Sequence, residues 1–85
     1  MKKDIALKIA NELEDYIIPL EGLFLKFHKD IIETHDHLPE YYLSNFWKAL
    51  SIYYKKSGDN KKEKECLKKS DSWWKEYLKM IDKLR

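Results

Sequence analysis

Residues that favour turns are scarce in this chain of 85 residues, which has two glycines, two prolines and a single cysteine. So few helix-breaking residues predict a small number of long helices. The lone Cys66 has no second cysteine with which to form an intrachain disulfide, and this favours a cytoplasmic protein. No apolar run reaches the roughly 18 residues of a membrane span, and no apolar core of a signal peptide follows the basic start. We therefore expect no contact with a membrane.

Motifs of catalysis are also missing. The sequence has no glycine-rich phosphate loop, no Ser-His-Asp context and no paired carboxylates above background. Cys66 has Lys62 and Lys69 at helical spacing, an arrangement that can lower the pKa of a thiol. Its place on an apolar helix face favours a core residue instead. We expect a non-enzymatic protein without a cofactor.

Three histidines form a candidate metal site, namely His28, His35 and His37, with Glu33 and Asp36 nearby. Imidazole and carboxylate groups bind zinc and other transition metals. A structural zinc site is completed by four well-placed ligands, and no cysteine spacing supports such a set here. A polar loop is the favoured interpretation, and no metal is predicted.

Charge is abundant and unevenly divided, with 38% charged residues and a net charge of +2. Residues 1–43 carry five lysines and nine acidic residues, while residues 44–85 carry twelve basic and six acidic residues. We expect the acidic and basic halves to attract each other, within one chain or across a dimer. A basic face for an acidic partner is the alternative.

Apolar residues in the first third of the chain recur at helical spacing. The main stripe contains Ala6, Ile9, Leu13, Tyr16, Leu20, Leu23 and Phe27, flanked by Ile17, Phe24 and Ile31. So broad a face predicts a core helix rather than a coiled-coil seam. Pro19 interrupts it, because proline removes a backbone hydrogen bond and disfavours helical angles in the preceding residue. One kinked helix or two helices of about 4–17 and 20–34 satisfy the pattern, and we predict two.

The second half of the chain is predicted to form a helical hairpin. One helix starts near Pro39 and ends at Gly58, the residue type that best adopts the left-handed conformation of a helix end. A second helix then runs almost to the C-terminus. Asp59 or Asn60 is expected to cap it, and Asn60 with Glu63 resembles a capping box.

This hairpin resembles one tetratricopeptide repeat over residues 44–77. The matching positions are Trp47, Leu50, Ser51, Tyr54 and Gly58 in the first helix and turn, and Leu67 and Ser70 in the second helix. Glu63 and Lys75 depart from the repeat pattern. The resemblance implies an antiparallel helix pair that serves as a scaffold for protein partners.

Adjacent aromatic residues suggest an exposed contact surface. Neighbouring helical residues point about 100° apart, so the pairs at 41–42, 53–54 and 73–74 cannot face one narrow stripe. Exposed tryptophan and tyrosine side chains are typical of interface centres. The sequence therefore predicts partner binding through Trp73, Trp74, Tyr53 and Tyr54.

Lysines around the turn offer an alternative function. The cluster comprises Lys55, Lys56, Lys61, Lys62, Lys68 and Lys69. Such a cluster can neutralise phosphates of a nucleic acid. Interspersed glutamates dilute it, and the chain has a single arginine, the commonest reader of guanine. A solvated helix face is the favoured interpretation.

These observations predict an all-α fold in one domain, residues 1–85. The expected architecture is an antiparallel bundle of three or four helices that ends in the repeat-like helix-turn-helix hairpin. The expected function is a non-enzymatic protein–protein interaction module that can self-associate as a homodimer through exposed aromatics. A small nucleic-acid-binding accessory protein is the alternative.

Overall fold

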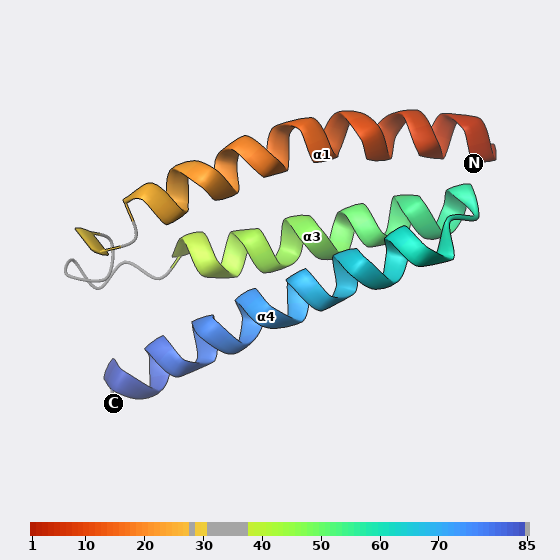
Figure 1. Ribbon diagram of the computed structural model, residues 1–85. Helices are drawn as coiled ribbons and strands as arrows, with labels where there is room; N and C mark the ends of the chain where they lie inside the picture. The colour runs from red at the N-terminus through yellow and green to blue at the C-terminus, as the bar shows by residue number, and fades with distance from the viewer. Residues whose placement is uncertain (28, 31–37, 85) are drawn as a thin grey trace.

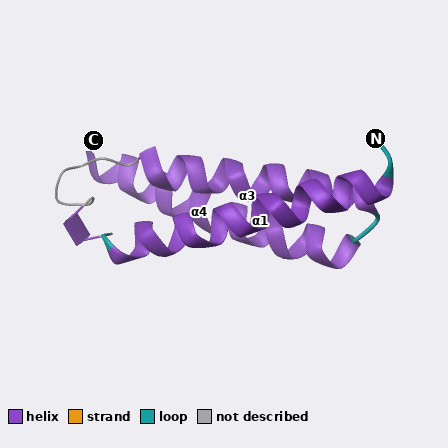
Figure 2. Ribbon diagram, turned by 90° about the horizontal axis from the view of Figure 1, so that it is seen from above, coloured by secondary structure: helices purple, strands orange, loops and turns teal. Residues whose placement is uncertain are grey.

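The computed structural model describes residues 1–27, 29–30 and 38–84. Within these residues it contains three helices and no strand: α1 (Lys3–Lys26), α3 (Leu38–Ser57) and α4 (Asn60–Leu84). Helix α3 runs antiparallel to both α1 and α4 (Figure 1). Seen from above, all three axes follow nearly the same direction, so the molecule is elongated (Figure 2). The predicted all-α bundle is confirmed.

The hairpin of α3 and α4 turns at Gly58 and Asp59. Gly58 has a φ of +89°, a conformation that side chains with a Cβ rarely adopt. The carboxylate of Asp59 accepts a hydrogen bond of 3.0 Å from the backbone N–H of Lys62. Asp59 therefore caps α4, which decides between it and Asn60, and the predicted position of the turn is correct.

Two serines set the seam between α3 and α4. The Ser44 hydroxyl donates to the Ser70 carbonyl at 2.9 Å, and the Ser70 hydroxyl donates to the Ser44 carbonyl at 2.8 Å. Both serines are buried. Because their side chains are small and their hydroxyls satisfy each other's backbone, the two helices approach closely in one fixed register.

Helix α1 runs unbroken through Pro19, so the prediction of two segments is wrong up to Lys26; residues 31–34 of the second segment lie outside the described residues. Pro19 and Asp15, whose carbonyl loses its hydrogen-bond donor, are both exposed. Water can satisfy that carbonyl, which lowers the cost of the proline. The helix curves with its convex side away from α3 (Figure 1), as helices that wrap a core do.

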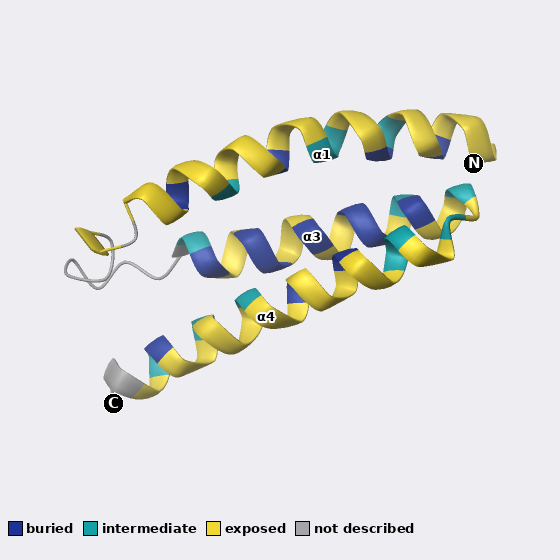
Figure 3. Cartoon of the chain, in the orientation of Figure 1, coloured by how far each residue is buried: buried dark blue, intermediate teal, exposed yellow. Residues whose placement is uncertain are grey.

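The core lies where the three helices meet, and its buried cluster consists of Ala10, Ile17, Trp47, Leu50, Tyr54 and Cys66. Buried positions face inward along each helix in Figure 3. On α1 they are spaced by four and seven residues, at Ala6, Ala10, Ile17 and Phe24.

The wide apolar stripe predicted for α1 is only partly covered. Its members Tyr16, Leu20, Leu23 and Phe27 are exposed, so the expectation that they join the core is wrong. The stripe spans more of the helix surface than one antiparallel neighbour covers. Helix α3 packs on the seam around Ile17 and leaves this edge of α1 open.

Candidate partner-binding groove

One edge of α1 is fixed to the hairpin by two carboxylates. The first is Glu14, which accepts a hydrogen bond from the Tyr54 hydroxyl and pairs with the Lys62 ammonium at 3.5 Å. The same ammonium lies 5.7 Å from the centre of the Tyr54 ring. A single carboxylate thus joins all three helices.

The second carboxylate is Glu21. One oxygen, Oε2, accepts the indole N–H groups of Trp47 at 2.8 Å and of Trp73 at 2.7 Å. The other oxygen lies 3.3 Å from the Lys69 ammonium, which also lies 4.5 Å from the centre of the Trp47 ring. Glu21 therefore satisfies two indoles that would otherwise lack an acceptor at the edge of the core.

The two arrangements are copies of one pattern displaced by two helical turns. Each pair of equivalent residues is seven positions apart: Glu14 and Glu21, Tyr54 and Trp47, Lys62 and Lys69. We call them the two polar layers. Because each layer has one member on each helix, they fix the register of α1 against the hairpin.

Two buried groups beside Glu14, the Tyr54 phenol and the Cys66 thiol, have raised pKa values. Burial, and then the hydrogen bond to Glu14, raise the pKa of the Tyr54 phenol. Burial raises the pKa of the Cys66 thiol to about 11. Lys62 and Lys69 act to lower that pKa, as the sequence suggested, but burial outweighs them, and Cys66 is a core residue.

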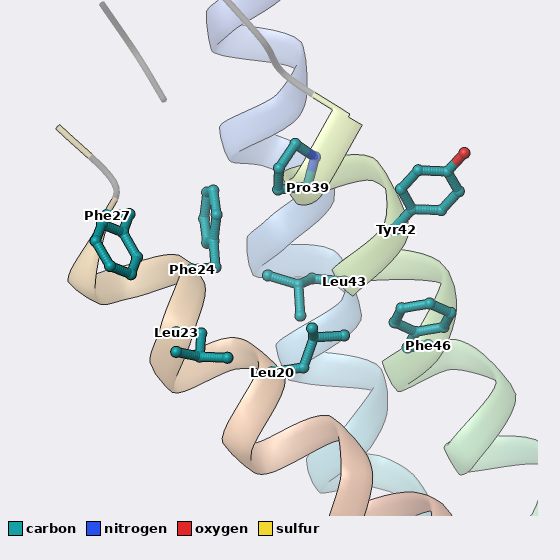
Figure 4. A pocket seen from close by; sticks show the side chains of 8 residues that line it. All are labelled: Leu20, Leu23, Phe24, Phe27, Pro39, Tyr42, Leu43 and Phe46. Carbon is teal, nitrogen blue, oxygen red and sulfur yellow. The ribbon is translucent and has the colours of Figure 1, made fainter. Parts of the chain in front are cut away.

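The opposite edge of α1 borders an apolar groove, with a volume of about 500 Å³ at its wider end. Its lining comes from α1 and α3, as Figure 4 shows: Leu20, Leu23, Phe24, Phe27, Pro39, Tyr42, Leu43 and Phe46. A narrower depression of about 170 Å³ continues it and shares Leu20 and Phe46. The depression is lined further by Leu13, Tyr16, Ile17 and Ala49. Together they form one groove along several turns of both helices.

The groove exposes large apolar side chains. Tyr16 is 76% exposed, Leu23 56% and Tyr42 50%. Six exposed side chains line the groove: Tyr16, Leu20, Leu23, Phe27, Tyr42 and Phe46. Together they offer on the order of 600 Å² of exposed surface. That equals the upper end of the largest apolar patches on monomers, which are about 300–600 Å² and often functional.

A row of aromatic rings leads from α4 to this groove. The Trp74 ring lies 5.3 Å from that of Tyr77, and Tyr77 lies 5.4 Å from Tyr41. Tyr41 lies 5.9 Å from Tyr42, whose ring stacks on Phe46 at 6.2 Å. We call these five residues the aromatic row; it links the exposed Trp74 to the groove wall.

The four residues predicted to bind a partner fall into different places. Tyr54 is buried, and Trp73 is half-buried with its N–H on Glu21, so both serve the core. Tyr53 is half-buried against the core with the Lys56 ammonium 5.8 Å from its ring centre. Trp74 is 41% exposed. The structure therefore does not gather the four into one surface.

The predicted lysine cluster is divided as well. Lys62 and Lys69 pair with the carboxylates of the polar layers. Lys55, Lys61 and Lys68 are exposed. Two of the six lysines are thus paired with carboxylates of α1.

Sequence reasoning missed Leu20, Leu23 and Phe46 as groove residues, because it assigned the apolar stripes to the core. The available signal was the width of the α1 stripe, which exceeds what one neighbour covers. The candidate metal ligands His28, His35 and His37 lie outside the described residues. Elsewhere in the described chain, no group of three or more histidine, cysteine or acidic side chains could hold a metal.

Comparison with known proteins identifies no relative: no family model, no curated protein and no solved structure matches the chain. None of the helices in the described ranges combines the length and apolar character needed to cross a membrane. The groove and the polar layers are therefore the observations from which function is argued.

Proposed function

We propose that this chain is a non-enzymatic protein–protein interaction module that binds an apolar helical surface in the groove between α1 and α3. The groove itself carries the proposal, since its exposed apolar side chains lie between two helices. Amphipathic helices bind in such grooves through residues repeated every three or four positions. We place the module in the cytoplasm, where the buried Cys66 stays reduced.

The hairpin adds support. Its likeness to a tetratricopeptide repeat suggests a scaffold for protein partners. Trp47 and Tyr54, two signature positions of that likeness, also hold α1 through the polar layers. The rigid hairpin thereby presents Tyr42 and Phe46 as one wall of the groove.

The nucleic-acid alternative has less support. Lys62 and Lys69 are engaged by Glu14 and Glu21, which removes two of the six proposed phosphate contacts. A salt titration of DNA and RNA binding tests this alternative, because phosphate contacts are strongest at about 50 mM salt. Binding that weakens steeply with salt would restore it.

Photo-crosslinking in cells tests the proposed function. A photoreactive amino acid is placed at Leu23, inside the groove, or at Leu25, outside it; both leucines are 56% exposed. We expect crosslinked protein bands from position 23 and few from position 25. If a probe at Leu23 and a second probe placed at Tyr42, which also lines the groove, both yield no protein adduct, the groove is not a protein-binding site.

A further inference from the structure

We propose that the groove is filled by a second copy of this chain, related to the first by a two-fold axis that runs parallel to the helices. This inference rests on the proposed function and names its partner. It follows from the area of the groove, from the charges at one end of its walls and from the antiparallel arrangement of α1 and α3.

The first step is area. Stable protein interfaces bury about 600–1,000 Å² on each partner. The six exposed side chains of the groove supply on the order of 600 Å², and the other exposed members of the aromatic row, Tyr41 and Trp74, add to it. Two copies of this face therefore reach the range of a stable dimer.

The second step is the charge at the ends of the two walls. On α1 the groove residues Tyr16, Leu20, Leu23 and Phe27 lie at steps of three and four residues, and one further step of four leads to Glu12. On α3 the groove residues Tyr42, Phe46 and Ala49 lie at the same steps, which lead on to the half-buried Tyr53 and then to Lys56. Residues at these steps lie along one side of a helix. Each line of side chains is thus apolar up to its last residue, which is charged. The two charges, on Glu12 and Lys56, have opposite sign.

These charges lie at the same end of the groove. Glu14 contacts Tyr54, so the residues two positions further toward that end, Glu12 on α1 and Lys56 on α3, lie at nearly one level. Both are exposed, and neither forms an ion pair with another described residue.

The third step is symmetry. A two-fold axis along the groove places α1 of each copy over α3 of the other, and it preserves helix direction and level. The four helices then alternate in direction around the interface, as in an antiparallel four-helix bundle. Glu12 of each copy comes to lie beside Lys56 of the other, so one contact is made twice. Homodimers of this kind are the commonest symmetric assemblies.

Sedimentation analysis across a concentration series tests the occupant. We expect the native chain to be a dimer at micromolar concentration. Leu23→Asp should weaken dimerisation at least about 100-fold, because it brings a carboxylate into an apolar interface. Leu25→Asp is the matched control, with the same residue type and exposure, and should leave the dimer unchanged. Circular dichroism checks that both variants keep their helix content.

Charge reversal tests the orientation. Glu12→Lys alone and Lys56→Glu alone each replace two attractive pairs by two repulsive ones, and we expect dimerisation to weaken roughly tenfold. The combination Glu12→Lys with Lys56→Glu should recover native affinity. Recovery supports the axis along the groove, and additive weakening of the two changes overturns it.

The outcomes separate this inference from the proposed function. A native chain that stays monomeric at all concentrations, or a dimer that Leu25→Asp disrupts and Leu23→Asp does not, overturns the second copy as occupant. Crosslinks from position 23 to other proteins would then still support the interaction module. Crosslinks from position 23 to this chain itself support both, and no crosslinks from the groove contradict both.

Discussion

On one edge of α1, Glu14 and Glu21 meet hydroxyl, indole and ammonium groups of the hairpin. On the other edge, Tyr16 and Leu23 lie exposed along an apolar groove. The first edge is complete within one chain, because every layer joins all three helices. The second edge exposes the kind of side chain that folding normally buries. This difference is the basis of our proposal that one edge serves folding and the other serves binding.

The largest effect is expected at Glu21. Glu21→Ala leaves the indole N–H groups of Trp47 and Trp73 without their acceptor, at the edge of the core. We expect a loss of about 3 kcal/mol in the free energy of unfolding, measured by urea denaturation. The control is Asp15→Ala, on the exposed side of α1, which should change stability by less than about 0.5 kcal/mol. Equal effects of the two changes would show that the layer does not hold α1.

The next effect concerns stability at alkaline pH and depends on Cys66, which lies on α4 in the core. Cys66 has its pKa raised to about 11 by burial, so its neutral thiol is favoured in the folded state. Its stabilising contribution is present below the unfolded pKa near 9.0 and is lost as pH rises toward 11. By linkage the loss is on the order of 2 kcal/mol. Urea denaturation at pH 8 and at pH 10.5 measures it.

The rate of thiol labelling compares the buried Cys66 with a cysteine placed on the groove edge of α1. At pH 8, native Cys66 should react with a disulfide reagent far more slowly than the urea-unfolded chain does. A cysteine introduced as Leu23→Cys, with Cys66→Ala, should react at nearly the unfolded rate when it is labelled at a concentration where the chain is monomeric. The alkaline loss of stability should also shrink in Cys66→Ala. Fast labelling of native Cys66 would contradict its burial in the core.

The hairpin could be predicted well from the sequence, whereas the two edges of α1 could not. Gly58 and the aromatic spacing before it located the turn, because such signals are local in sequence. The roles of Glu14 and Glu21 depend on hydrogen-bond donors that lie 26 to 52 residues away in the sequence. Their charge by itself is typical of a solvated surface. Periodicity showed that Leu20 and Leu23 belong to an apolar face. It could not show which neighbour covers that face.

Pro19 shows the same limit from the other side. The cost of proline in a helix depends on whether water reaches the carbonyl that loses its donor. Here that carbonyl belongs to Asp15, which is exposed. The local rule predicted a break at a position where the tertiary surroundings permit a continuous, curved helix.

A smaller effect is expected at the two glycines. Gly58→Ala forces a Cβ into a φ of +89° and should cost about 1–2 kcal/mol, although the nearest side-chain atom is 3.8 Å away. Gly22→Ala, inside α1 with nothing within 4 Å of its Cβ, should stabilise by up to about 1 kcal/mol. Thermal denaturation compares them. A stabilising Gly58→Ala would contradict the left-handed turn.

The smallest effect on stability is expected for a substitution on the groove edge of α1. Leu23→Gln removes an apolar side chain that is 56% exposed in the single chain. We expect it to change the free energy of unfolding by less than about 0.5 kcal/mol, measured at a concentration where native and variant chains are monomeric. A loss near 3 kcal/mol, as for Glu21→Ala, would mean that Leu23 packs within its own chain. The groove would then be part of the core, and both edges of α1 would serve folding. An unchanged monomer that no longer associates would instead assign the apolar edge to binding alone.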